Sequence, residues 1–241
     1  MIAHDPSLVI LSITIAILGT FTASVMTSNL GVLSRGEGRM RIVMASITLG
    51  GCIWAMNFVG LLSISIGAPV NLTRDPTLLG GSAAVSFVGT AVALFMLWPN
   101  AMNAARLPFA IILLGIVISA TSYLGIAAVA GRGIELSWFL ASICAVFATQ
   151  SGLMLLVFLF QPRGVILTLL GAVALGLLLT AAHYLAIASA PGLEEALLAI
   201  PRSHTGISER HLAWAATIMM YFVCSICLSV FVIAQFRDDI R

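Results

Sequence analysis

The sequence predicts an all-α integral membrane protein, a seven-transmembrane-helix bundle built from three helix-pair repeats plus a seventh helix. Composition is the first reason: the 241 residues are 61% hydrophobic and 8% charged, with a mean hydropathy of +1.13. Soluble domains carry about 25% charged residues. Secondly, seven separate runs reach the length of about 20 apolar residues that a membrane-spanning helix needs. Thirdly, similar short motifs recur in the even-numbered runs.

Each predicted helix is an apolar run whose ends carry turn-forming or charged residues. SRGEGRMR (34–41) and GAPVNLTRDP (67–76) are two of the breaks. Glycine, proline and arginine at such positions end helices or mark the aqueous ends of membrane spans. No run is left over for a soluble domain, so we expect residues 1–241 to form a single membrane domain. The predicted helices cover residues 7–33, 41–66, 78–98, 106–130, 136–160, 164–190 and 212–236.

The arginines predict how the chain crosses the membrane. All 11 basic residues are Arg, and basic residues are enriched in cytoplasmic loops. The side that holds the odd-numbered loops and the C-terminal tail has more of the arginines than the other side. This difference predicts an inner-membrane, multi-pass protein with its N-terminus outside and its C-terminus cytoplasmic. The start, MIAHDPSLVI, lacks the basic region of a cleavable signal peptide. The two sets are Arg35, Arg39, Arg41, Arg106, Arg163, Arg237 and Arg241 against Arg74, Arg132, Arg202 and Arg210.

Several functional classes are disfavoured by residues that the chain lacks. Without any lysine, it cannot form the Schiff base of a retinal protein. A net charge of +2 gives no indication of nucleic-acid binding. Acidic residues fall only in predicted loops and termini, so neither proton-coupled transport nor enzymatic catalysis is expected. The four cysteines lie in apolar runs and are expected to be buried thiols, including the C-x-x-C pair Cys224 and Cys227.

Three even-numbered runs share a pattern: GGCIWAMNFVGLL (50–62), GIVISATSYLGIA (115–127) and GLLLTAAHYLAIA (176–188). We align them on a central column formed by Asn57, Ser122 and His183. Each column residue has a glycine seven residues before it, an aromatic residue one position after it and a small residue three positions after it. The matched positions are Gly50, Gly115 and Gly176, then Phe58, Tyr123 and Tyr184, then Gly60, Gly125 and Ala186.

His183 stands out within its apolar run and has two interpretations. A polar group in hydrocarbon must find a partner inside the protein, and ionisable residues in membranes face the bundle interior. The first interpretation is a polar cluster between helices, with Asn57, Thr121, Ser122 and Tyr123 as candidate partners. The second is a ligand for a metal ion or a small molecule. Both remain open from the sequence.

The segments WAMNFVG, ATSYLGIA and AAHYLAIA resemble the repeated Met-His-Tyr-Thr signature of the MHYT family, bacterial integral membrane sensor domains. The opening HDPSLVILSITIAILGTFTA is also similar to the family's start. The resemblance implies a copper ion bound through motif Met and His residues, and sensing of oxygen, carbon monoxide or nitric oxide. The implied metal ligands are Met56 and His183, with His4 as a supplement if the N-terminal segment folds over the mouth of the bundle.

The chain departs from this family signature at most of the implied ligands. Asn57 and Phe58 stand in the first motif where the family has His and Tyr, and Thr121 and Ser122 replace Met and His in the second. Ala182 replaces the Met of the third. Copper(I) prefers thioether, thiolate and imidazole donors, so we expect weak or absent copper binding.

Two functions follow as hypotheses. The first is an MHYT-like membrane sensor or signalling domain with a degenerate metal or small-ligand site near the outer face, with Asn57, Ser122, Tyr123 and Tyr184 as its ligand-site or polar-cluster residues. Since only a short polar tail follows the last predicted helix, it would act through a partner protein in the membrane or cytoplasm. The alternative is a non-catalytic accessory or anchoring subunit of a membrane complex with no bound metal.

The predicted topology can be tested with reporter fusions. A reporter joined after Arg241 should be active in the cytoplasm, and one inserted between Pro191 and His211 should be active outside, because seven spans put these two points on opposite sides. Fusion pairs of alkaline phosphatase and a fluorescent protein give the readout. A C-terminus outside the cytoplasm would contradict the topology and place His183 near the cytoplasmic face.

Overall fold

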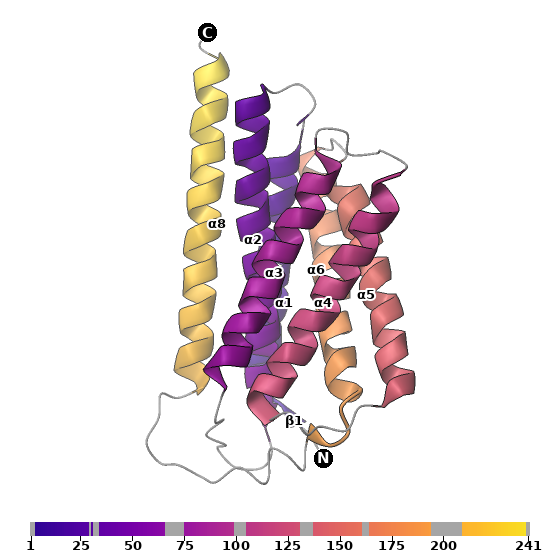
Figure 1. The fold of residues 1–241 in the computed structure, drawn as a ribbon. Helices are drawn as coiled ribbons and strands as arrows, with labels where there is room; N and C mark the ends of the chain where they lie inside the picture. The colour runs from indigo at the N-terminus through magenta and orange to yellow at the C-terminus, as the bar shows by residue number, and fades with distance from the viewer. Residues whose placement is uncertain are drawn as a thin grey trace.

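The computed structural model describes residues 3–28, 30, 34–65, 75–98, 105–130, 137–160, 164–193 and 209–239. Within these ranges, seven helices are long and apolar enough to cross a membrane, which confirms the predicted all-α seven-helix fold. The helices lie side by side, and the two ends of the chain are at opposite ends of the bundle (Figure 1). They are α1 (Pro6–Thr27), α2 (Arg35–Leu62), α3 (Pro76–Leu97), α4 (Leu107–Ala130), α5 (Trp138–Leu159), α6 (Val165–Ala188) and α8 (Glu209–Asp239).

The helix ends differ from prediction mainly around the first loop. The predicted break at 34–41 is largely helical, because Ser34 and Glu37 form a capping box that starts α2 at Arg35. The Ser34 side chain accepts a hydrogen bond from the Glu37 N–H, and the Glu37 carboxylate accepts one from the Ser34 N–H. Such reciprocal bonds satisfy otherwise unpaired amides at a helix start. Helix α1 ends at Thr27 rather than at 33.

Two odd-numbered helices begin with the same local chemistry. Asp5 and Asp75 are each followed by proline, and each aspartate side chain accepts a hydrogen bond from the backbone N–H two residues later, at 2.9 Å in both cases. Aspartate is a strong N-cap, and proline at the first helical position has no N–H to leave unpaired. The sequence Asp-Pro-Ser/Thr therefore sets the start of both helices at the same end of the bundle.

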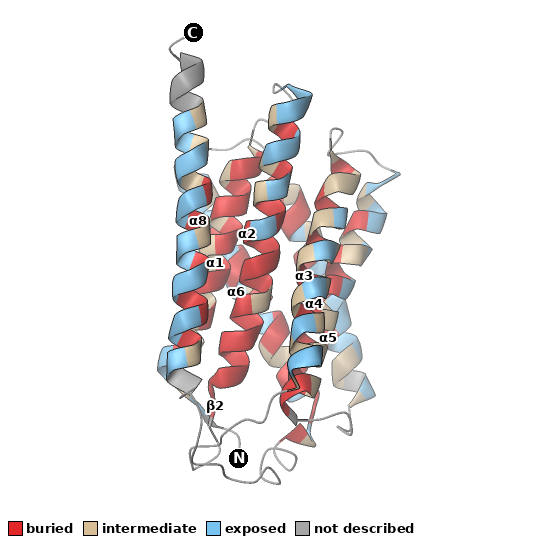
Figure 2. Ribbon diagram, turned by 60° about the vertical axis from the view of Figure 1, so that its left-hand side comes forward, coloured by how far each residue is buried: buried red, intermediate tan, exposed pale blue. Residues whose placement is uncertain are grey.

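Three even-numbered helices form the inner part of the bundle, and odd-numbered helices pack around them. The even-numbered helices α2, α4 and α6 contact one another in the middle, while α1 packs against α2 and α6, α3 against α2 and α4, and α5 against α4 and α6. Helix α8 lies outside this group of six and packs against α1 and α2. Consistent with this arrangement, α2 is buried along most of its length, whereas the outer face of α8 is exposed (Figure 2).

The glycine of each aligned motif is where an even-numbered helix meets an odd-numbered one. A Cβ added at Gly50 would lie 2.9 Å from the backbone oxygen of Ser86 on α3. The equivalent atom at Gly115 would lie 2.8 Å from Cα of Thr149 on α5, and at Gly176 2.8 Å from the backbone nitrogen of Ile17 on α1. The glycines thus allow backbones to approach closely, as small residues do in membrane helix packing.

A second contact is common to the three helix pairs. The N-cap residue of each odd helix donates its backbone N–H to the even helix that follows it in the chain, at a carbonyl six residues beyond the central column. The three pairs agree with a threefold repeat of helix pairs, although the repeat itself stays a prediction. They are Asp5 to Ser63 at 2.7 Å, Asp75 to Ala128 at 2.8 Å and Ser137 to Ser189 at 2.8 Å.

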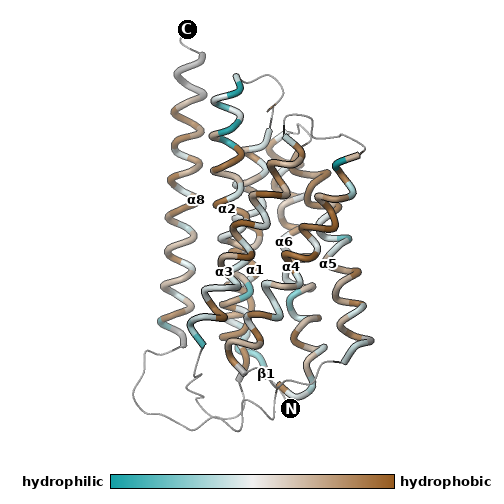
Figure 3. Tube along the Cα trace, in the orientation of Figure 1, coloured by the Kyte–Doolittle hydropathy of each residue, from teal (hydrophilic) through white to brown (hydrophobic). Residues whose placement is uncertain are grey.

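The outer surface of the bundle fits a lipid environment. Large apolar side chains such as Ile10, Phe109, Val165 and Phe222 are exposed, and hydrophobic residues dominate the middle of the helices (Figure 3). A soluble monomer rarely exposes apolar patches of this extent, so the chain is a multi-pass membrane protein. Its orientation stays a prediction, since five of the arginines lie outside the described residues: Arg74, Arg132, Arg163, Arg202 and Arg241.

The glycine contacts can be tested by adding a methyl group. Gly50→Ala and Gly176→Ala should each lower the stability of the purified protein by about 1–3 kcal/mol, the usual cost of overpacking. Gly80→Ala on α3 is the matched control, since no atom lies within 4 Å of its added Cβ; it should be neutral or slightly stabilising. Thermal unfolding in detergent measures the difference. Equal effects at all three positions would contradict the close-approach interpretation.

Candidate functional site

His183 lies where the three even helices meet. Its side chain is fully buried on α6, and its Nδ1 is 3.4 Å from the Ser122 hydroxyl of α4. The Ser122 hydroxyl in turn lies 3.2 Å from Oδ1 of Asn57 on α2 and 3.1 Å from the backbone oxygen of Ile118. Asn57, Ser122 and His183 are therefore joined across three helices, and we call them the polar cluster.

The donor and acceptor roles within the polar cluster are assigned from its hydrogen-bond network. The single Ser122 proton is directed to carbonyl oxygens, Oδ1 of Asn57 or the oxygen of Ile118, so Ser122 accepts from His183. That bond requires the proton of a neutral imidazole to be on Nδ1, which leaves Nε2 with a free lone pair. The amide orientation of Asn57 is assigned from the same network. Among the described residues, His183 Nε2 and Asn57 Nδ2 have no hydrogen-bond partner.

The unpaired Nε2 atom is directed toward α2 at Gly60. A Cβ at Gly60 would lie 2.6 Å from Nε2 and 2.7 Å from Cδ2 of His183. The small residue three positions after the central column therefore makes room for the imidazole, and a side chain there would displace it. A buried polar atom without a partner costs about 1–3 kcal/mol, and in a native structure it indicates a strained site or a position for a ligand or water.

A short N-terminal strand covers the end of the bundle near His183. Strand β1 (Ala3–His4) pairs antiparallel with β2 (Ile64–Ser65), with His4 opposite Ile64. His4 Nδ1 lies 3.1 Å from the Ser63 hydroxyl, and its ring centre is 5.2 Å from that of Tyr184 in an edge-to-face contact. Partial burial lowers the pKa of His4, which favours a neutral ring. Residues 3–4 thus lie over the end of the bundle near His183, and the role of His4 as a metal ligand stays a prediction.

The two tyrosines of the motifs fasten neighbouring even helices together. Tyr184 OH lies 3.4 Å from the Ser63 hydroxyl, and Tyr123 OH lies 2.9 Å from the Ser189 hydroxyl. In both cases the tyrosine follows the central column by one residue, and the serine follows it by six on another even helix. We call these two contacts the tyrosine latches.

At the third equivalent position, between α2 and α4, neither the tyrosine nor the serine of a latch is present. Phe58 stands where the other motifs have tyrosine, and Ala128 stands where the other helices have Ser63 and Ser189. Replacing both partners of a buried hydrogen bond by apolar groups is nearly neutral, whereas removing one partner is costly. The departure of Phe58 from the family signature is therefore matched by a second change six residues beyond Ser122.

A small cavity lies where α2 faces α3 and α4. It has a volume of about 10 Å³ and is bordered by residues of α2, α3 and α4, including Trp54, Asn57, Ser82 and Thr121. Space of this size accommodates about one water molecule. The Trp54 indole N–H donates to the Ser82 hydroxyl at 3.2 Å, which leaves Asn57 Nδ2 as the unpaired donor beside the cavity.

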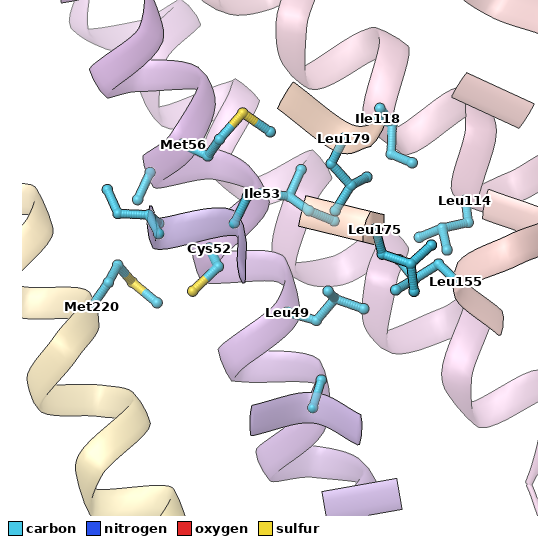
Figure 4. Packing of buried hydrophobic residues seen from close by; sticks show 14 of the residues in the cluster. Leu49, Cys52, Ile53, Met56, Leu114, Ile118, Leu155, Leu175, Leu179 and Met220 are labelled. Atoms are coloured by element: carbon cyan, nitrogen blue, oxygen red, sulfur yellow. The ribbon is translucent and has the colours of Figure 1, made fainter. Parts of the chain in front are cut away.

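The donor set does not fit the copper site that the family resemblance implies. Only Nε2 of His183 is a free soft or borderline donor in the polar cluster, while Asn57 and Ser122 are weak ligands for copper(I). Met56 is fully buried in the large apolar core (Figure 4). Across the described residues, no group of three His, Cys, Asp or Glu side chains could hold a metal ion. Met56, His183 and His4 as metal ligands therefore remain a prediction.

Sequence reasoning identified the column but not all of its partners. Thr121 was a candidate partner of His183, yet its hydroxyl donates within its own helix to the Val117 oxygen at 2.7 Å. Tyr123 was another, and it instead reaches Ser189. Ser63 and Ser189 were missed, although their common spacing from the central column is visible in the sequence and could have been aligned.

Comparisons with known proteins agree with this architecture. Residues 50–112 match the model of the MHYT family, described as a bacterial signalling protein N-terminal repeat. The matched segment begins at Gly50 and ends three residues before Gly115. It therefore covers nearly the whole distance from the glycine of the first motif to the glycine of the second. Residues 50–112 of the helical bundle are thus similar to an MHYT repeat, and the resemblance inferred from the motifs is confirmed.

Two relatives are signalling proteins by description. One is the bifunctional diguanylate cyclase/cyclic di-GMP phosphodiesterase MucR of Pseudomonas aeruginosa, 28% identical over 194 residues that make up 78% of this chain and 28% of MucR. The other is the signaling protein YkoW of Bacillus subtilis, 20% identical over 234 residues, 94% of this chain and 29% of YkoW. The chain thus spans less than a third of either relative. No solved structure matches it. These findings support a membrane sensor or signalling role.

The role of His183 can be tested by removing its imidazole. His183→Ala should lower stability by roughly 0.6–2 kcal/mol, the range for polar contacts between membrane helices, because the contact between His183 and Ser122 is lost. His211→Ala is the control, since His211 is exposed at the start of α8. Protein purified from copper-replete cells should contain no copper that depends on His183. Stoichiometric copper lost in His183→Ala, measured by elemental analysis, would show instead that a copper site survives.

Proposed function

We propose that this chain is a non-catalytic membrane sensor domain in the inner membrane, in which a small ligand bound at the polar cluster changes the packing of the even helices. The observation that carries the proposal is the unpaired Nε2 of His183, fully buried where α2, α4 and α6 meet. A functional site accounts for such an atom better than packing does, since packing alone favours a paired or apolar group.

The surroundings of Nε2 support coupling between a ligand and the helices. Nε2 faces Gly60 of α2, so a molecule bound to it must enter the contact between α6 and α2. The same two helices are joined by the longer tyrosine latch, from Tyr184 to Ser63, and Ser63 also contacts His4 of the covering strand. A ligand that favours a slightly wider α2–α6 spacing would weaken these contacts. Its binding would then shift the protein from the packing described above toward a second packing with the wider spacing.

The class of ligand follows from the donors. Because the polar cluster offers one imidazole lone pair and one amide N–H, it suits a small molecule better than a multidentate metal ion. The family resemblance implies oxygen, carbon monoxide or nitric oxide as the sensed molecules. The signal would pass to a protein partner in the membrane or cytoplasm.

A second candidate function is a non-catalytic accessory or anchoring subunit of a membrane complex. The bonds among Asn57, Ser122 and His183 favour it, because they already form a connected cluster across three helices. In that case His183 acts as a buried polar fastener, and the two motif histidines have been replaced by residues that keep helices together without binding a ligand.

The two candidates differ in their response to dissolved gas. The wild-type protein in lipid nanodiscs is unfolded thermally under argon, oxygen, carbon monoxide and nitric oxide. The sensor proposal expects at least one gas to shift the melting temperature, with the shift abolished in His183→Ala and retained in His211→Ala, because stabilisation follows ligand binding to the folded state. No shift with any gas, or a shift unchanged in His183→Ala, would contradict the sensor proposal.

A further inference from the structure

Sulfur-bearing side chains meet where α2 contacts α8, apart from the polar cluster. Cys52 of α2 and Cys224 of α8 are 172 residues apart in the chain, yet their Sγ atoms are 3.9 Å apart. Both side chains are essentially fully buried. The sequence pairs Cys224 with Cys227 in a C-x-x-C, but the structure pairs Cys224 with Cys52, whereas Cys227 lies one helical turn further on.

The walls around the two thiols come from three helices. The Cys52 side chain rests on the bare backbone of α1 at Gly19, where an added Cβ would collide with it. Met220 lies one turn before Cys224, and its thioether packs on Gly51, the neighbour of Cys52. Figure 4 shows the Met220 side chain extending from α8 toward Cys52. The Thr22 hydroxyl of α1 lies beside Cys224 and makes no hydrogen bond of normal geometry among the described residues.

We propose that Cys52 and Cys224 bind one soft monovalent metal ion, Cu(I) or Ag(I), with Met220 as a third donor. Thiolate and thioether sulfur are the ligands that select such ions. Metal–sulfur bonds of about 2.3 Å, the length of a zinc–thiolate bond, span 3.9 Å at an angle of about 115°, which suits three-coordinate geometry. The distance between the two sulfurs therefore already matches that of a shared metal ion. A disulfide would need them about 2.05 Å apart, which requires the seated Cys52 side chain to move.

The net charge left in this apolar site favours a monovalent ion, because only one thiol proton must leave. When a monovalent cation binds, one S–H bond breaks, one S–metal bond forms and the proton leaves to water, so the site stays neutral. The second thiol keeps its proton and donates a lone pair. A divalent cation would leave a net charge, which is costly to bury, unless both thiols lost their protons. The unpaired Thr22 hydroxyl is placed to donate to a metal-bound thiolate.

Metal binding here would fasten α8 to the rest of the bundle. Helix α8 packs mainly against α1 and α2, and its outward face is exposed along much of its length (Figure 2). A bond from Cys224 through the metal to Cys52 would hold α8 against α2 at mid-height. The site is independent of the polar cluster and of the function proposed for it, because it uses neither His183 nor Asn57.

Silver(I) nitrate is the probe, since Ag(I) does not oxidise thiols to a disulfide as copper cycling can. Reduced, chloride-free protein in detergent is incubated with Ag(I), desalted and analysed for silver per chain. We expect one silver ion per chain in the wild type, in His183→Ala and in Cys227→Ser, and its loss in Cys52→Ser and Cys224→Ser. Met220→Leu, a volume-conserving change, should weaken the affinity about tenfold while the fold is retained, a loss equivalent to about 1.4 kcal/mol.

Several results would overturn the metal site. They are an absence of bound silver in the wild type, retention of silver in both Cys52→Ser and Cys224→Ser, and loss of silver in Cys227→Ser or His183→Ala. A Cys52–Cys224 disulfide found by peptide mapping after diamide treatment, in protein that binds no silver when reduced, would also reject it in favour of a thiol switch. Circular dichroism and metal-free melting temperatures identify folded variants, and Cys52→Ala and Cys224→Ala replace any serine variant that does not fold.

Discussion

The absence of water from the bilayer core is the constraint on which this structure depends. A polar group at that depth must find its partner within the protein, and the bundle meets much of this requirement by bringing α2, α4 and α6 into mutual contact, with His183 Nε2 and Asn57 Nδ2 among the exceptions in the described part of the chain. Most serine and threonine hydroxyls in the helices bond to carbonyls of their own helix, as Ser46 and Thr180 do. The polar cluster is different, since Asn57, Ser122 and His183 reach across three helices.

Close backbone contact makes those inter-helix bonds geometrically accessible. Gly50, Gly115 and Gly176 each seat an even helix against an odd one, which holds the three central helices at a common height. The column residues, seven positions further along, then face one another in the middle of the bundle. Packing and polar pairing are thus two results of one spacing in the sequence, a glycine followed by a polar residue two turns later.

The end of the bundle near His183 shows how the aligned motifs differ while their hydrogen-bonding groups stay matched. Two of its three equivalent interfaces carry a tyrosine latch, and the third has Phe58 with Ala128 as the corresponding residues. Since both polar partners are absent together, no unpaired hydroxyl is buried there. The three interfaces therefore differ in polarity, and the cavity beside Asn57 lies on the apolar side between α2, α3 and α4. Any ligand-driven change in packing would start from this asymmetry.

The sequence by itself determined the seven helices, the membrane environment and the column of Asn57, Ser122 and His183. Apolar run length and repeated spacing are local properties, and they survive folding unchanged. Tertiary structure alone decided which atoms meet. Hydrogen-bond partners such as Ser122 for His183, and contacts such as Cys52 with Cys224 or His4 with Tyr184, depend on helix rotation and on which helices adjoin. In a helix that is apolar on all sides, no amphipathic stripe indicates which side faces the other helices. The sequence therefore does not predict which residues distant in the chain contact one another, and only the packed bundle shows it.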